Sequence, residues 1–195
     1  MNRLFPDLCY TMAPGDCHPE LPRAGEYHAM SFGLGSLSYE EAVFLYGLVI
    51  GSKPTNVLET GAETGASAVH IARALADQGF GHLYTVEIEP IYCEATRKVL
   101  ADAGLLKWAT VVNQDALHFI RTTDLLFDMA FLDTSISLRI EEFRRVKGRM
   151  RRGSLVAIHD TRPEHPMGDM RIDAELSAER MIHLPSPRRM SIVQV

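Results

Sequence analysis

The stretch Val57-Leu58-Glu59-Thr60-Gly61-Ala62-Glu63-Thr64-Gly65-Ala66-Ser67 joins a short apolar run to a glycine-containing turn and then to a helical segment. Glycines at a strand-to-helix turn let the backbone pass close to a ligand, and the first N–H groups of the helix can face an anion. Taken alone, the turn is equally compatible with tight packing of the strand on the helix. The stretch therefore predicts a strand, a turn that could hold a ligand, and a helix.

A second apolar run, Leu83-Tyr84-Thr85-Val86-Glu87, ends in an acidic residue. Glu87 follows Gly61 at about the distance at which an acid accepts hydrogen bonds from a ribose hydroxyl in nucleotide-binding sheets. The alternative is an acid that only stabilises the start of the next helix, before Pro90. The turn and the acid together fit one nucleoside.

Five apolar runs alternate with helical segments along the middle of the chain. Strands this continuously apolar are buried on both faces, and helices between them cover the sheet. The pattern predicts an α/β domain with a parallel sheet and helices on both sides. The runs lie at residues 56–59, 83–87, 109–112, 127–132 and 155–158, and helices are expected at about 65–78, at 92–103 with Tyr92, Ala95, Val99 and Ala103 on one face, near Leu117 and at about 138–149.

The two ends of the chain depart from this alternation. Residues 1–30 are rich in proline and lack a sustained period, which predicts an irregular arm or lid and leaves residues 31–195 as one domain. Ser38 and Glu41 form a capping-box pattern that predicts a helix running to about residue 50. Near the C-terminus, the runs 181–184 and 190–195 are joined by too few residues for a crossover helix. The last strand is therefore expected to run antiparallel.

Length and composition narrow the class of protein. The chain has 195 residues, of which 46% are hydrophobic and 23% charged, as expected for one globular domain with a sizeable core. The 20 Lys and Arg residues against 25 Asp and Glu residues give a net charge of −5, which disfavours a general affinity for phosphate backbones. Three cysteines, no signal pattern and no membrane-length apolar run favour the cytoplasm.

Four stretches jointly resemble the class I S-adenosylmethionine-dependent methyltransferases, and among them the small O-methyltransferases similar to catechol O-methyltransferase. They are residues 57–69, Val86-Glu87-Ile88-Glu89-Pro90, Val111-Val112-Asn113-Gln114-Asp115-Ala116 and Phe127-Asp128-Met129-Ala130-Phe131-Leu132-Asp133. The resemblance covers about residues 38–160. It implies a three-layer αβα Rossmann-like methyltransferase fold, with a seven-stranded, mostly parallel sheet whose last strand is antiparallel.

The same resemblance implies where S-adenosylmethionine binds. The turn from Gly61 to Gly65 would hold the methionine end, Glu87 the ribose hydroxyls, Asp115 with Ala116 the adenine edge, and Asp133 would lie beside the methyl donor. The cofactor carries a carboxylate but no phosphates, which agrees with a turn that has fewer glycines than the dinucleotide fingerprint. Further predicted cofactor contacts are Glu59, Ser67 and Ile88.

The predicted catalytic residues follow the fourth and fifth strands. Methyl transfer needs the acceptor, carbon and sulfur in line, and a hydroxyl acceptor needs a base or a metal. Asp133, His159 and Asp160 lie where open α/β sheets place their clefts. We favour His159 as a general base near neutral pH, oriented by one of the two aspartates. The alternative is a histidine that only satisfies backbone groups of its loop.

A second hypothesis is that the same residues bind magnesium. In the metal-dependent members an Asp after the fourth strand and an Asp-Asn pair after the fifth bind the ion through oxygen. A gapless count from Gly153 places His159 at the paired Asp, and a shift of one residue would place Asp160 there and Thr161 at the Asn. Asp133 and Asp160 are the predicted ligands if magnesium is used. Ile136 stands where the catechol enzymes carry a catalytic lysine.

These observations predict a methyltransferase that acts on a small molecule, at oxygen, with a homodimer as an open expectation. Two alternatives remain: a catalytically silent cofactor-binding subunit, and an RNA methyltransferase that uses a basic cluster. The cluster is more typical of a solvated helix face. A nicotinamide oxidoreductase is disfavoured because the third fingerprint glycine is absent. The basic cluster comprises Arg144, Arg145, Lys147, Arg149, Arg151 and Arg152.

Overall fold

The computed structural model describes residues 37–162, 170–186 and 188–195. The predicted arm over residues 1–30 lies outside these ranges, so the expected boundary at residue 31 stays a prediction. None of the helices in the described ranges has the length and apolar character needed to cross a membrane.

Seven strands form one sheet in the order β3-β2-β1-β4-β5-β7-β6. β1 to β5 are mutually parallel, and β7 runs antiparallel to both β5 and β6. The predicted fold class, including the antiparallel last strand, is confirmed. The strands are β1 (Asn56–Thr60), β2 (His82–Glu87), β3 (Ala109–Asn113), β4 (Phe127–Leu132), β5 (Met150–Ile158), β6 (Arg180–Leu184) and β7 (Met190–Gln194).

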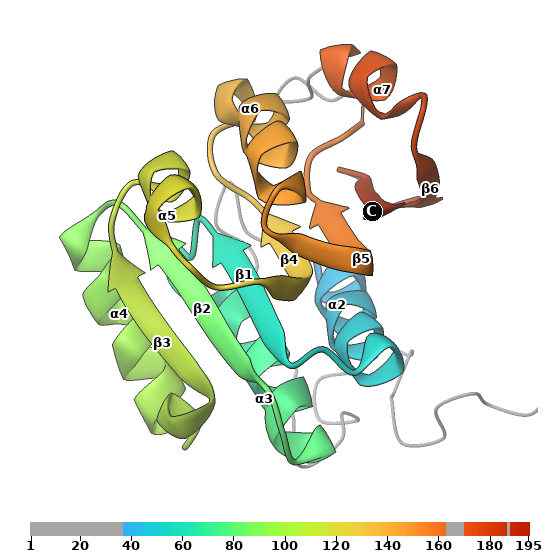
Figure 1. Cartoon of the computed structure of the whole chain (residues 1–195). Helices are drawn as coiled ribbons and strands as arrows, with labels where there is room; N and C mark the ends of the chain where they lie inside the picture. The colour runs from blue at the N-terminus through green and yellow to red at the C-terminus, as the bar shows by residue number, and fades with distance from the viewer. Residues whose placement is uncertain (1–36, 163–169, 187) are drawn as a thin grey trace, which may run out of the picture.

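Helices cover both faces of the sheet, as Figure 1 shows, and give three layers. One core lies between the sheet and helices α2 to α4, and a second lies under α5 to α7. Burial on both faces explains why β4 and the second half of β5 are apolar at nearly every position. The helices are α2 (Tyr39–Ser52), α3 (Ala66–Gln78), α4 (Pro90–Asp102), α5 (Ala116–Thr122), α6 (Ile136–Lys147) and α7 (Met170–Leu176), with a 3-10 turn η1 (Leu106–Trp108).

The predicted capping box opens α2. The Glu41 N–H donates to Ser38 Oγ at 3.3 Å, and the Ser38 N–H donates to Glu41 Oε2 at 2.9 Å. Each residue satisfies a backbone donor that the first helical turn leaves free. The helix runs past the predicted end to Ser52, and Lys53 closes it in a left-handed conformation.

The predicted apolar face of helix α4 is confirmed only in part: Val99 and Ala103 pack partly buried against the core, but Tyr92 does not. The buried residues of this helix are Cys93, Thr96 and Leu100, whereas Tyr92 is exposed. Two polar contacts hold the start of the helix: the Thr96 hydroxyl donates to Glu63 O, and the Cys93 thiol donates to Glu87 O. Both contacts tie α4 to the carboxyl ends of β1 and β2, which leaves Tyr92 directed toward the cavity described below.

Candidate active site

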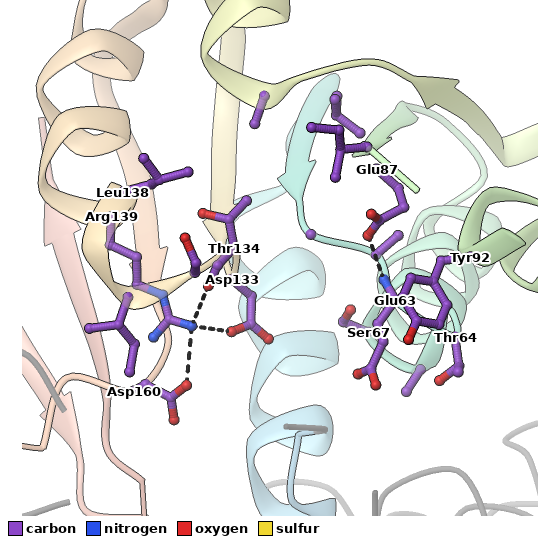
Figure 2. A pocket seen from close by; sticks show the side chains of 18 of the residues that line it. Glu63, Thr64, Ser67, Glu87, Tyr92, Asp133, Thr134, Leu138, Arg139 and Asp160 are labelled. Carbon is purple, nitrogen blue, oxygen red and sulfur yellow. Dashed lines mark hydrogen bonds and ion pairs between the residues drawn. The ribbon is translucent and has the colours of Figure 1, made fainter. Parts of the chain in front are cut away.

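A cavity of about 420 Å³ lies at the carboxyl ends of β1, β2 and β4. β1 is the strand at which the sheet order reverses, since β2 lies on one side of it and β4 on the other. Open α/β sheets bind ligands at this switch point. Figure 2 shows the two walls, formed by Glu63, Thr64, Ser67, Glu87 and Tyr92 on one side and by Asp133, Thr134, Leu138, Arg139 and Asp160 on the other.

Two glycines shape the turn between β1 and α3. Gly61 and Gly65 both have positive φ angles, 81° and 87°. A Cβ on Gly61 would lie 2.5 Å from the carbonyl oxygen of Asp133, and a Cβ on Gly65 would lie 3.0 Å from the Cα of Thr96. Gly61 therefore lets the turn pack against the end of β4, and Gly65 lets it pack against α4.

Glu87 closes the cavity at the end of β2. Its carboxylate accepts hydrogen bonds from the N–H groups of Glu63 at 3.0 Å and of Glu89 at 2.9 Å. These bonds fix the side chain and still leave lone pairs on both oxygens for a ligand. The predicted ribose acceptor is therefore held in place against the wall of the cavity.

The predicted cofactor residues divide into two groups. Most line the cavity, whereas Gly65 packs on α4 and Glu59 is fully buried at the end of β1. Burial raises the pKa of Glu59 to about 7, with the carboxylates of Asp133 and Glu87 acting in the same direction and the hydroxyls of Ser67 and Thr85 opposing them. The predicted cofactor residues that line the cavity are Gly61, Ser67, Glu87, Ile88, Asp115, Ala116 and Asp133.

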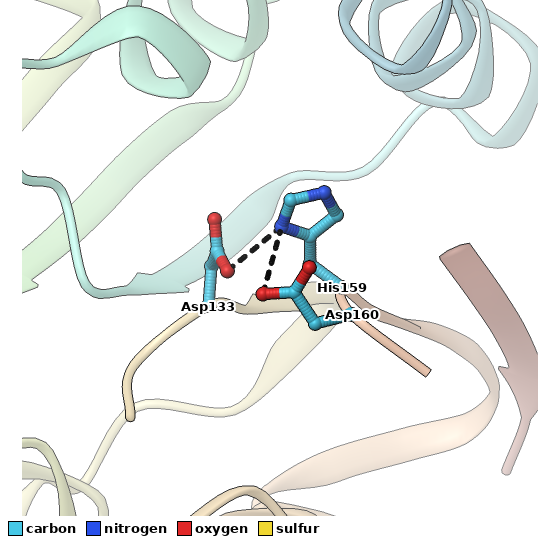
Figure 3. A group of neighbouring side chains, drawn as sticks. All are labelled: Asp133, His159 and Asp160. Carbon is cyan, nitrogen blue, oxygen red and sulfur yellow. Dashed lines mark hydrogen bonds and ion pairs between the residues drawn. The ribbon is translucent and has the colours of Figure 1, made fainter. Parts of the chain in front are cut away.

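His159 lies behind the cavity wall and has no exposed surface. Its Nδ1 is 2.9 Å from Asp133 Oδ1 and its Nε2 is 3.1 Å from Glu41 Oε2. Figure 3 shows the ring beside Asp133 and Asp160. Burial lowers the pKa of His159, but the carboxylates of Asp133 and Glu41 outweigh it and raise the pKa to about 9. The ring is thus charged at neutral pH, and its two N–H groups donate hydrogen bonds to Asp133 and Glu41.

This environment does not support the predicted role of His159 as a general base, because a protonated ring has no lone pair to accept a proton. The pKa of its partner Glu41 is correspondingly low: burial raises it, but hydrogen bonds from His159, Ser186 and Ser38 and the charge of His159 lower it to about 2. A fully buried ion pair joins α2 to the end of β5.

Arg139, on α6, bridges the two aspartates. Its Nη2 group donates to Asp133 Oδ1 at 2.8 Å, to Thr134 O at 2.9 Å and to Asp160 Oδ2 at 3.1 Å. Its Nη1 group donates to His159 O, and only 3% of the side chain is exposed. The sequence does not distinguish Arg139 from the other basic residues of α6, so its role was not predicted.

Asp160 is held from both sides. Arg188 donates to both of its oxygens, through Nε and Nη2, opposite Arg139. Burial raises the pKa of Asp160, but the charges of His159, Arg188 and Arg139 outweigh it and lower the pKa below the usual range. Asp160 also has a positive φ of 57°, a conformation that aspartate tolerates better than most residues.

The site is therefore a row of alternating charges. Asp133, Arg139, Asp160 and Arg188 line the cavity, and of these Asp133 has a carboxylate oxygen that the row does not use. Its Oδ1 accepts from His159 and Arg139, while its Oδ2 has no partner within the described residues. Asp133 Oδ2 is thus available to a ligand. The order of the row is Glu41, His159, Asp133, Arg139, Asp160 and Arg188.

The sequence matches a family profile described as a methyltransferase domain over residues 58–161, more than half of the chain. The chain belongs to this methyltransferase family. The matched segment runs from β1 to the residues that follow β5, and it contains the glycine turn, Glu87, Asp133 and Asp160. The family resemblance predicted from the sequence is confirmed. No curated protein matches the sequence significantly.

Solved structures resemble this methyltransferase in fold. The O-methyltransferase TomG from Streptomyces achromogenes, involved in tomaymycin synthesis and crystallised with SAM, is 24% identical, with a TM-score of 0.71 over 83% of this chain and 82% of that one. Cofactor-bound Rv0187 from MTB is 22% identical, with a TM-score of 0.73 over 87% and 85% of the two chains. An O-methyltransferase from Bacillus cereus in complex with SAH is 19% identical, with a TM-score of 0.70 over 87% of each chain.

The basic cluster of this methyltransferase is largely engaged with its own acidic residues. Arg144 and Lys147 on α6 pair with Glu175 and Glu179. The remaining contacts join Arg145 to Glu141, Arg151 to Asp128, and Arg149 to the carbonyl groups of Ile120 and Arg121. The cluster lies away from the residues that line the cavity, so the RNA alternative gains no support from it.

Proposed function

We propose that this methyltransferase moves the methyl group of S-adenosylmethionine to a small-molecule acceptor, with oxygen as the acceptor atom. The observation that carries the proposal is that the glycine turn, Glu87 and Asp133 line one cavity at the switch point of the sheet. The similar structures crystallised with SAM or SAH support the choice of cofactor, and their description as O-methyltransferases supports oxygen.

In this proposal the walls of the cavity divide the cofactor between them. The turn after β1 and the start of α3 take the methionine end, Glu87 and Ile88 take the ribose, and Asp115 with Ala116 takes the adenine. When bound, S-adenosylmethionine would supply an activated methyl group on a sulfonium sulfur. The protein contributes alignment, since holding the reactants in line supplies much of the rate of such a displacement.

We assign the acceptor side to Asp133. Its Oδ2 has no partner in the described part of the chain, so it can accept a hydrogen bond from an acceptor hydroxyl and orient the oxygen lone pair. As the new C–O bond forms and the C–S bond breaks, the same oxygen would take the hydroxyl proton. His159 acts through Asp133: its Nδ1–H donates to the other carboxylate oxygen and fixes the carboxylate plane. Asp160 acts in turn through Arg139.

Binding of S-adenosylhomocysteine tests the cofactor site. Glu87→Ala should weaken binding by about 1.5–3 kcal/mol in titration calorimetry, because a charged acceptor of hydrogen bonds is lost. Glu89→Ala, on an exposed residue two positions away, should change the affinity little. Unchanged affinity in Glu87→Ala would sink the cofactor assignment. Binding of NAD in preference to S-adenosylhomocysteine would point to an oxidoreductase.

Transfer itself is tested with methyl-labelled S-adenosylmethionine and a library of small hydroxylated acceptors. Label should appear on an acceptor oxygen, located by mass spectrometry. Tight cofactor binding without transfer to any acceptor would favour the silent-subunit alternative. We also propose a cytoplasmic location, from the cysteine usage, and a homodimer, which light scattering on the purified chain would test.

A further inference from the structure

A side chain already occupies the space between the two aspartates that the family resemblance assigns to magnesium. The ligand atoms of Asp133, His159 and Asp160 lie within 4.8 Å of one another, close enough to suggest a cation site. However, Arg139 Nη2 lies 2.8 Å from Asp133 Oδ1 and 3.1 Å from Asp160 Oδ2. Magnesium needs its oxygens at about 2.0–2.1 Å. An ion bound to these two oxygens would overlap the guanidinium nitrogen.

The neighbouring groups do not complete a set of hard ligands. Both ring nitrogens of His159 contact carboxylates, and imidazole is a poor magnesium ligand in any case. The hydroxyl of Thr161, the alternative to the family's asparagine, contacts Ser191 Oγ at 2.7 Å and Arg189 O at 3.2 Å. Thr161 is fully buried by these contacts, and it does not line the cavity.

The charged side chains at this site leave no excess negative charge for a divalent ion to neutralise. Asp133 and Asp160 carry two negative charges, and Arg139 and Arg188 supply two positive charges in direct contact with them. Guanidinium groups stay protonated throughout the physiological pH range. A divalent ion would therefore have to displace a buried arginine that makes four hydrogen bonds, and would leave that arginine without its carboxylates.

We propose that Arg139 is the built-in cation of this site. Its guanidinium group takes the place of a divalent metal between Asp133 and Asp160, and methyl transfer proceeds without a metal there. Arg139 is a positioning residue: it holds Asp133 so that Oδ2 faces the cavity. The catalytic part of this inference rests on the proposed function, but the exclusion of the metal does not.

The experiment is a Mn²⁺ titration of the full chain, followed by electron paramagnetic resonance and calorimetry. The wild-type protein and Arg139→Lys, which keeps the positive charge, should show no Mn²⁺ site. Arg139→Gln, which removes the positive charge, should gain a Mn²⁺ site with an affinity at least about tenfold above any residual Mn²⁺ binding by the wild type. The double variant Arg139→Gln/Asp160→Asn should lose this site again. Arg145→Gln, on the exposed face of the same helix, serves as the control and should behave like the wild type.

A wild-type Mn²⁺ site that Asp160→Asn abolishes would overturn the proposal. So would a folded Arg139→Gln protein that binds no Mn²⁺, because Arg139 would then not be what excludes the metal. If Arg139→Gln does not fold, the wild-type Mn²⁺ titration and a chelator assay still test the proposal. EDTA should leave the rate of methyl transfer unchanged. A loss of transfer that added magnesium restores would overturn the proposal. A chain that binds no cofactor contradicts the proposed function instead, and leaves the Mn²⁺ titration valid.

Discussion

The carboxylate of Glu41 caps a helix and also forms a buried ion pair. It completes the capping box of α2 through the Ser38 N–H, and the same oxygen contacts Nε2 of His159. Its other oxygen accepts from the hydroxyl of Ser186. A buried carboxylate with this many donors stays charged, because each donor offsets part of the cost of removing it from water. The capping box is local, whereas the ion pair joins two distant parts of the chain.

Replacing Glu41 tests the ion pair. Glu41→Gln should lower the free energy of unfolding by about 3–5 kcal/mol at pH 7, because it leaves His159 as a buried charge with one carboxylate fewer. Urea unfolding measures the effect. Glu40→Gln, on the exposed neighbour in the same helical turn, is the matched control and should change stability little. Equal effects of the two substitutions would rule out an energetic role for the pair.

His70 should make the free energy of unfolding fall as the pH becomes acidic. Burial in α3 lowers its pKa to about 3, and nearby Arg73 adds to the effect. Since the unfolded chain binds a proton near pH 6.5 and the folded chain does not, the contribution to stability is complete above pH 6.5 and is lost as the pH falls toward 3. The loss reaches about 2 kcal/mol at pH 5.

The His70→Leu variant checks this dependence. Urea unfolding at pH 7.5 and pH 5 should show a smaller loss of stability in His70→Leu than in the wild-type protein. His118→Gln, which changes an exposed histidine, should retain the wild-type loss. The prediction is wrong if both variants lose as much stability as the wild type between the two pH values.

At the scale of elements, the turn between β1 and α3 is fixed by its contact with the end of β4. The sequence leaves open whether Gly61 makes room for a ligand or for tight packing of the turn. The structure shows tight packing, because a Cβ on Gly61 would lie 2.5 Å from Asp133 O and 2.9 Å from Thr134 N. Both atoms belong to the backbone and cannot rotate away. A substitution there therefore disturbs folding as well as binding, and moves Asp133.

Two glycines with the same φ separate steric overlap from backbone strain. Gly61 and Gly79 both have φ of 81°, but a Cβ on Gly79 meets nothing within 4 Å. Gly79→Ala should cost about 1 kcal/mol of stability from the left-handed conformation alone. Gly61→Ala should cost more, about 2–4 kcal/mol, and should also weaken binding of S-adenosylhomocysteine. Equal melting temperatures for the two variants would show that the turn relaxes freely.

At the scale of the whole molecule, pairs between α6 and the segment from α7 to β6 account for much of the basic cluster. Arg144 and Lys147 extend from α6 to acids that follow in sequence only after the β5 strand. A chain with a net charge of −5 and a basic cluster engaged in this way offers little to a phosphate backbone. The geometry therefore fits a small acceptor better than a nucleic acid.

Filter binding with a structured RNA tests this conclusion. The wild-type protein should show no salt-dependent affinity at moderate ionic strength, and the double variant Arg144→Ala/Lys147→Ala should behave identically. An RNA affinity that falls steeply with salt and disappears in the double variant would support the alternative hypothesis of an RNA methyltransferase.

Local pattern determined the order of the seven strands and of helices α2 to α6, the capping box of α2, and the placement of Gly61, Glu87 and Asp133 at strand ends, but it did not predict α7. Strand burial, helix capping and turn geometry each depend on residues close in sequence, so the sequence exposes them. The burial of Cys93 and Thr96 at the start of α4 was not predicted, because it depends on two polar contacts with the residues at the ends of β1 and β2.

Only the tertiary structure decided what the charged residues do. Glu41 contacts His159 across 118 residues, and Arg188 contacts Asp160 across 28. These contacts form because β5 lies between β4 and β7, and because α2, with Glu41 in its first turn, packs beside α3 against the sheet. The state of His159 follows from these partners. A histidine in a loop is a plausible base by its ordinary pKa, but between two buried carboxylates it holds its proton. Charge interactions act through space, so a residue's partners, and with them its chemistry, are set by the fold.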